Sequence, residues 1–98
     1  MLIRIVKLEF KESHITTFLL DFEEVKDKIR NFPGCRSLQL LQDKSHPNIF
    51  FTYSTWESED ALEAYRKSAL FGEVWPRTKK LFHAKPMAWS VNSIENLE

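Results

Sequence analysis

The segment from Ile49 to Trp56 constrains the fold most, because it carries large apolar side chains on both sides of a predicted β-strand. Successive residues of a strand point to opposite faces, so Phe50 and Trp56 lie on one face while Ile49 and Phe51 lie on the other. Residues 2–10 have the same character. Strands with no polar face belong in the middle of a sheet that is covered on both sides.

A single apolar stripe predicts a helix over residues 14–31. Its members recur at steps of three and four residues, which is the spacing of one helical face: Ile15, Phe18, Leu19, Phe22, Val25 and Ile29. Ser13 is placed to act as the N-cap of this helix, and the turn at residues 32–34 ends it. A strand over residues 35–42 is expected to follow.

A second helix is expected immediately after Ser58, which is a suitable N-cap. Gly72 is expected to loosen this helix. Pro76 is expected to begin a further helical stretch within residues 74–82, since proline suits the first turn of a helix. The last strand is predicted over residues 84–93, at an edge of the sheet.

The predicted elements form one domain, residues 1–98, with residues 94–98 as a tail. Their order, β-α-β-β-α-β, predicts an α+β fold of the ferredoxin-like type, with a four-stranded antiparallel sheet and both helices on one face. The helices then leave one apolar face uncovered. We expect a homodimer that packs sheet against sheet through this face; the alternative is that side chains fold over a weakly exposed face.

Composition excludes several classes of function. Fourteen basic residues balance fourteen acidic ones, so no basic surface for nucleic acid is expected. Cys35 is the single cysteine, which fits a reducing compartment and a buried structural role. Charged residues interrupt the apolar run at the N-terminus, and no segment has the ~20 apolar residues of a membrane helix. We therefore expect a cytoplasmic protein that does not bind membranes.

The sequence also lacks the usual motifs for cofactors and metals. It has only two glycines, far apart, so no glycine-rich loop can hold a nucleotide phosphate. His14, His46 and His83 are expected on separate elements, without the spacing of a zinc site. We expect neither a metal nor a cofactor.

The aromatic residues Trp56, Tyr65 and Trp75 are expected to gather near the junction of the third strand and the second helix. They are either core residues with satisfied polar groups or the wall of a pocket for a flat aromatic ligand. In the second interpretation Tyr65 and Trp56 orient the substrate by hydrogen bonds. Arg66 is expected to point into solvent. The other residues predicted to shape the pocket are Phe22, Phe51 and His83.

Residues 49–65, followed by Ser68-Ala69-Leu70-Phe71, resemble the antibiotic biosynthesis monooxygenase domain family. The resemblance implies a homodimeric α+β barrel with a pocket between helices and sheet in each subunit. Some members oxygenate phenols or quinols with dioxygen and use no flavin, haem or metal. The deprotonated substrate itself supplies electrons to oxygen, while the protein binds it and excludes water.

A haem-degrading branch of this family has a different set of residues. Its pattern has an Asn where Val6 stands, a Trp where Tyr65 stands and an iron-binding His where Trp75 stands. All three positions differ, and tryptophan cannot bind the iron, so haem degradation is not expected. Other small members carry a His near the position of Tyr65, and a phenol is a weaker base than an imidazole.

Three hypotheses of function follow. The first is a cofactor-independent monooxygenase that acts on a small aromatic or quinol substrate. The second is a non-catalytic binding module that keeps only the dimer fold, which a filled interior around Tyr65 would favour. The third is an isomerase of a small carbonyl compound, which needs His14 or His83 beside the cavity to act as its base.

Overall fold

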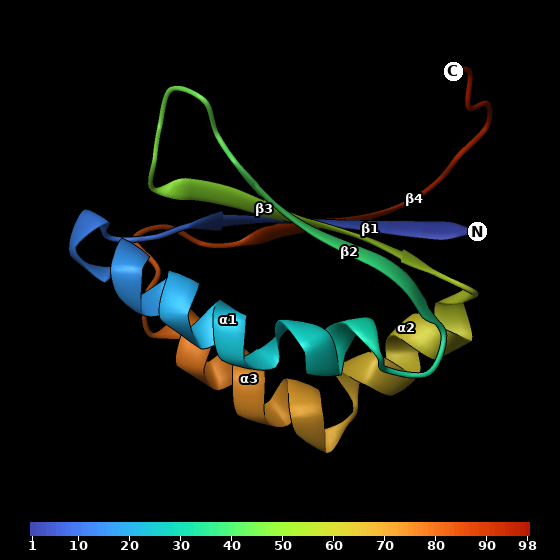
Figure 1. Ribbon diagram of the computed structural model, residues 1–98, viewed down its shortest axis with the longest axis horizontal. Coiled ribbons are helices and arrows are strands. Elements are labelled where there is room, and N and C mark those ends of the chain that lie inside the picture. Colours follow the sequence, from blue (N-terminus) through green and yellow to red (C-terminus); the bar gives the residue numbers. More distant parts are fainter.

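The computed structural model describes residues 1–98. It consists of one sheet with three helices packed on one face, and the opposite face of the sheet is uncovered (Figure 1). The elements run in the predicted order, with the second helical region divided in two. In sequence they are β1 (Leu2–Glu9), a short 3-10 turn η1 (Glu12–His14), α1 (Ile15–Arg30), β2 (Cys35–Gln42), β3 (Ile49–Trp56), α2 (Glu59–Arg66), α3 (Ala69–Lys79) and β4 (Met87–Asn92).

The four strands form one antiparallel sheet in the order β2-β3-β1-β4. The two strands with apolar residues on both sides, β1 and β3, are therefore central, which confirms the ferredoxin-like prediction. β4 is an edge strand as expected, and it begins at Met87 rather than at residue 84. Pro86 immediately precedes it, since proline has no N–H to donate to the neighbouring strand.

The start of α1 differs from the prediction. Ser13 lies inside the 3-10 turn, and His14 occupies the N-cap position without a side-chain hydrogen bond to the helix. Phe18, Val25 and Ile29 are buried, as the apolar stripe predicts. Leu19 is 43% exposed, because it lies at the border of the stripe rather than at its centre.

The break between the second and third helices also lies elsewhere than predicted. Ser58 caps α2 as expected, because its side chain accepts a hydrogen bond from the N–H of Ala61. A second cap, Ser68, begins α3 by accepting from the N–H of Phe71. Gly72 and Pro76 therefore lie inside α3, and the two expectations for them were wrong. A side-chain cap satisfies N–H groups at the start of a helix, and this signal outweighs the weak preferences of an isolated glycine.

Two buried clusters lie at opposite ends of the layer between sheet and helices. One cluster forms where the N-terminal end of β1 meets the C-terminal end of β3: Leu2, Cys35, Trp56 and Leu62. The other forms at the opposite end of the same strands: Leu8, Phe10, Phe18 and Phe50. Each cluster joins the helices to the sheet, and the space between the clusters is the place where a cavity can form.

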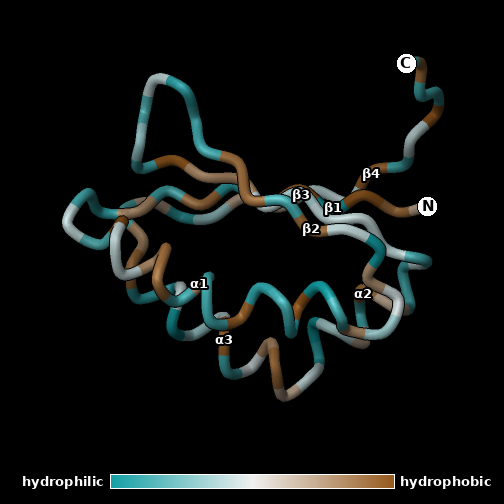
Figure 2. The backbone as a smooth tube through the Cα atoms, viewed as in Figure 1, coloured by the Kyte–Doolittle hydropathy of each residue, from teal (hydrophilic) through white to brown (hydrophobic).

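The opposite face of the sheet has no helix over it (Figure 1). By strand alternation this face carries the paired residues Ile5 and Tyr53 in the centre of the sheet and Trp89 at its edge. On the edge strands this face exposes large apolar side chains: Leu41, Met87, Trp89 and Val91. Hydrophobic residues therefore occur along strands of which one face has no helix over it (Figure 2). No helix is long and apolar enough to cross a membrane.

Candidate functional site

A cavity of about 310 Å³ lies between the sheet and the helices, lined by 20 residues of which 14 are hydrophobic. Its floor is the helix-facing side of the sheet, where short side chains follow one another across neighbouring strands. Thr52 pairs with Val6 and Val6 with Ala88, while Ser54 pairs with Arg4. Because these floor positions carry no large aromatic, the space between the two buried clusters stays open.

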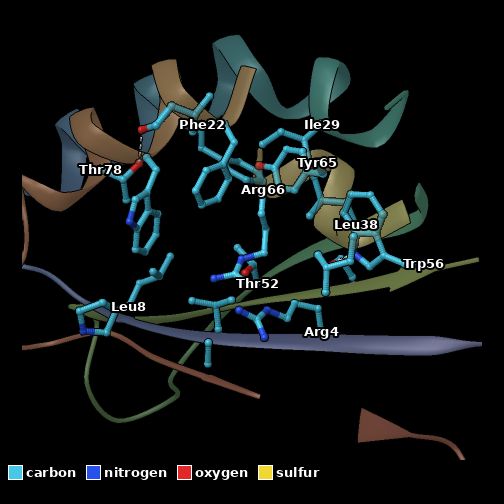
Figure 3. Close-up of a pocket in the computed structure, with 18 of the residues that line it drawn as sticks. Arg4, Leu8, Phe22, Ile29, Leu38, Thr52, Trp56, Tyr65, Arg66 and Thr78 are labelled. Atoms are coloured by element: carbon cyan, nitrogen blue, oxygen red, sulfur yellow. Dashed lines mark hydrogen bonds between the residues drawn. The ribbon is translucent and has the colours of Figure 1, made fainter. Parts of the chain in front are cut away.

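The roof of the cavity comes from all three helices (Figure 3). Phe22 and Ile29 of α1 lie on one side, and Tyr65 and Arg66 of α2 on another. α3 contributes Phe71, Val74, Trp75 and Thr78. The lining is thus apolar and aromatic with a small number of polar groups, which is the usual character of a small-molecule site.

Trp56 and Tyr65 form the innermost aromatic pair of the cavity. Their ring centroids lie 5.2 Å apart with an angle of 28° between the planes, which is a stacked arrangement. The Trp56 indole N–H donates to the hydroxyl oxygen of Ser54 at 3.0 Å. Trp56 is only 1% exposed. Its N–H is therefore committed inside the protein, and the prediction that Trp56 orients a substrate by a hydrogen bond is corrected: Trp56 supports Tyr65 from behind.

Tyr65 is half-buried, and its hydroxyl forms no hydrogen bond with another group of the chain. Burial, assisted by the neighbouring Cys35, raises the pKa of Tyr65 to about 12. A phenol with the ordinary pKa is already neutral at physiological pH, and the raised pKa of Tyr65 makes loss of its proton harder still. A neutral phenol that faces a cavity can donate a hydrogen bond to a bound oxygen atom, and it is a poor base.

Trp75 reaches the same cavity through a chain of aromatic contacts. Tyr65 meets Phe71 edge-on at 5.2 Å, and Phe71 stacks on Trp75 at 5.7 Å. The predicted gathering of Trp56, Tyr65 and Trp75 is present, although Phe71 makes the connection and not a loosened turn at Gly72. Phe22 also lines the cavity, as predicted.

Two residues predicted to shape the pocket lie outside it. Phe51 pairs with Lys7 and points to the uncovered face of the sheet, since it alternates with Phe50 and Thr52 on the helix-facing side. His83 is exposed in the connection between α3 and β4, where its backbone N–H donates to the carbonyl of Glu9 at 2.8 Å. Neither side chain contributes to the cavity.

Histidine is absent from the lining of the cavity altogether. His14 lies at the start of α1, and its Nδ1 atom is buried without a hydrogen-bond partner. The isomerase hypothesis required His14 or His83 beside the cavity as a base, and the structure provides neither. No group of three or more His, Cys, Asp or Glu side chains lies in a position to hold a metal ion.

Two arginines line the cavity that the sequence analysis did not assign to it. Arg66 was expected in solvent, and its side chain is 47% exposed. It also borders the cavity, because it extends from α2 toward the sheet (Figure 3). Arg4 lies on the floor beneath the helices. One signal in the sequence marks Arg4: it has the same strand parity as Val6 and Leu8, so it faces the helices.

Fold and site together define a ferredoxin-like α+β protein with one main cavity between its sheet and its helices. The family model for antibiotic biosynthesis monooxygenase matches residues 1–75. The chain therefore belongs to the antibiotic biosynthesis monooxygenase family. A search among curated proteins gave no significant match.

Solved structures of the family have the same architecture. The crystal structure of an antibiotic biosynthesis monooxygenase superposes with a TM-score of 0.90 at 21% identity, covering 97% of this chain and 100% of that one. A candidate antibiotic biosynthesis monooxygenase from Nitrosomonas europaea gives 0.89 at 15% identity over 97% and 100% of the two chains. One from Deinococcus radiodurans gives 0.89 at 16% identity over 100% and 97%. At these identities the similarity establishes the shared fold.

Proposed function

We propose that this protein is a monooxygenase that needs no cofactor and acts on a small aromatic quinol. The observation that carries the proposal is the cavity itself: aromatic and apolar side chains line it, and it contains one phenol, Tyr65, whose hydroxyl has no partner in the chain. Membership of the family supports the same class of reaction. The volume of about 310 Å³ lies at the lower end of typical ligand sites, which favours a substrate of one or two rings.

The proposed reaction balances without an external reductant. A hydroquinone anion transfers electrons to dioxygen, one oxygen atom is inserted at a ring C–H position, and the other oxygen atom leaves as water. The substrate loses two hydrogens to that water and becomes a hydroxylated quinone. The protein's part is to hold the ring, keep water away and stabilise negative charge on the substrate oxygen.

In this proposal Tyr65 donates its O–H to the anionic oxygen of the substrate. The Tyr65 phenol is protonated at physiological pH and can donate, and the stacked Trp56 ring fixes its position. Trp75 and Phe22 provide the apolar walls that contact the substrate ring. Deprotonation of the quinol falls to bulk solvent, because no histidine or carboxylate lines the cavity.

A screen of oxygen consumption with hydroquinones of one and two rings tests the proposal. We expect enzyme-dependent uptake above the rate of autoxidation, with one hydroxylated quinone formed for each dioxygen. Tyr65→Phe should lower kcat by at least about 10-fold, the loss expected for one oriented donor to a developing charge, while thermal stability changes little. Lack of uptake with every quinol, or equal loss of stability and activity in Tyr65→Phe, would favour a non-catalytic module.

We also propose that two copies pack through the uncovered face of the sheet. The apolar side chains on this face, among them Trp89 and Val91, support a contact with a second sheet. A two-fold arrangement would place the same patch of both copies against each other. The dimer would also rigidify the sheet that forms the floor of the cavity.

A further inference from the structure

The charged groups that line the cavity are of one sign. Arg4 and Arg66 are both present, and no aspartate or glutamate lines the space. The two residues come from different elements, β1 and α2, and Figure 3 shows Arg66 extending across the cavity toward the strands from which Arg4 rises. Two guanidinium groups beside an apolar chamber give it a positive potential that favours an anionic ligand.

The chain supplies only part of the missing negative charge. Glu63, one turn before Arg66 on α2, accepts from Arg66 Nη1 at 3.4 Å and also lies 3.8 Å from the ammonium of Lys67. Its carboxylate lies outside the cavity lining and is half-exposed. One carboxylate thus serves two neighbouring cations on its own helix.

Arg4 has no carboxylate of its own. Its one side-chain hydrogen bond is donated by Nη1 to the neutral hydroxyl of Ser90 at 2.9 Å. Burial, and then the positive charge of Arg66, lower the pKa of Arg4, whereas the negative charge of Glu63 acts in the opposite direction. A guanidinium has five N–H donors, so most of those on Arg4 are left for another acceptor.

A carboxylate is the group that fits these donors. Guanidinium groups bind carboxylates through paired, charge-assisted hydrogen bonds, which are stronger than those between neutral groups. The rest of the cavity is suited to a ring, with Phe22, Phe71 and Trp75 in its wall. The phenol of Tyr65 precedes Arg66 in sequence and can serve a hydroxyl on the same ligand.

We infer that the ligand of this cavity is an aromatic acid, a hydroxylated benzoate whose carboxylate is held by Arg4 and Arg66 while its ring lies among the aromatic side chains. This inference rests on the proposed function for the choice of cavity, and it adds the charge of the substrate. It predicts that neutral quinols bind more weakly than their carboxylated analogues. It also explains why a charged residue occupies a strand position that faces the helices.

Binding can be measured without any oxygen chemistry, by titrating the protein under anaerobic conditions and following tryptophan fluorescence and heat. Three probes suffice: 2,5-dihydroxybenzoate, its methyl ester and hydroquinone. The methyl ester keeps the ring and both hydroxyls but removes the charge. We expect the acid to bind at least about 10-fold more tightly than the ester, the gain typical of a charge-assisted hydrogen bond.

Substitutions locate the effect. Arg4→Gln and Arg66→Gln should each weaken binding of the acid by about 10-fold and leave binding of the ester unchanged. Lys67→Gln is the matched control, because it removes an exposed cation from the same helix outside the cavity. If Arg4→Gln does not fold, Arg66→Gln carries the test, since that side chain is half-exposed.

The outcomes separate this inference from the proposed function. Equal affinity for acid and ester, failure of the acid to bind at millimolar concentration, or an equal effect of Lys67→Gln overturns the inference. Oxygenation of neutral quinols with no preference for the acid would keep the function and reject the charge assignment. Tight, arginine-dependent binding of the acid without oxygen uptake would keep the inference and reject the monooxygenase.

Discussion

The stacked rings of Trp56 and Tyr65, 5.2 Å apart, join the buried core to the cavity. Trp56 is enclosed and hydrogen-bonded to Ser54, whereas the Tyr65 hydroxyl has no partner in the chain. The polar group of Trp56 is therefore used within the fold, whereas the hydroxyl of Tyr65 is available to hydrogen-bond a ligand. Both residues line the cavity, and only Trp56 is also a fully buried member of the core.

The hydrogen bond from Trp56 to Ser54 predicts a specific loss of stability. Ser54→Ala leaves the buried indole N–H without an acceptor, which should lower the free energy of unfolding by about 1–3 kcal/mol. Urea denaturation measures the change. In a Trp56→Phe background the same serine substitution should cost less, since the donor is gone. Equal costs in both backgrounds would mean that Ser54 acts through packing and not through this bond.

Tyr65 predicts a dependence of stability on alkaline pH. Its pKa is raised by burial from 10 in the unfolded chain to about 12 in the fold. Below pH 10 the phenol is protonated in both states, and its stabilising contribution is fully present. As the pH rises from 10 to 12 the unfolded chain loses this proton first, so the contribution declines by at most about 3 kcal/mol.

The comparison with Tyr65→Phe isolates this effect from other groups that titrate in the same range. Unfolding by urea at pH 8, 10 and 11 should show wild type losing more stability than the variant. Spectrophotometric titration at the phenolate band should show one tyrosine ionising late. Parallel stability curves for the two proteins would show that Tyr65 is not shifted by its surroundings.

Local signals predicted the sheet well, because they agree with one another. The two-residue alternation of apolar side chains in β1 and β3 requires a central place for both strands, and the order of elements leaves few alternatives. The helix boundaries near Ser68 were harder to predict. Gly72 weakens a helix and Pro76 suits the start of one, but the capping serine that begins α3 earlier decides the outcome.

The site was predicted less completely, since a cavity depends on where small side chains leave room as well as on where large side chains form walls. Phe51 was placed in the pocket on the strength of its ring, although strand alternation directs it to the other face. Arg4 was overlooked because a lone charge on a strand suggests solvent. Its partners across the sheet, and the helices above it, show that it faces the interior.

The uncovered face of the sheet predicts a dimer, and a single substitution to a charged residue on this face should dissociate it. Trp89 lies on this face opposite Ile5 and is 41% exposed. Wild type should sediment as a dimer at micromolar concentration. Trp89→Glu should sediment as a monomer, because it buries a charge in an apolar contact. Leu20→Glu is the control: Leu20 is 64% exposed on α1, away from the sheet, and its variant should stay dimeric. A monomeric wild type would contradict the proposed interface.

The two glycines predict opposite responses to the same substitution. Gly34 has φ of +88°, and a Cβ there would lie 2.4 Å from the Cβ of Ala61 in α2. Gly34→Ala should therefore lower the free energy of unfolding by more than about 1 kcal/mol, from backbone strain and from the clash.

Gly72 lies within α3, and nothing would touch a Cβ there. Gly72→Ala should raise the free energy of unfolding by about 0.5–1 kcal/mol through helix propensity. Thermal melts measure the change in stability of both variants. A destabilised Gly72→Ala would show that α3 does not continue through this position.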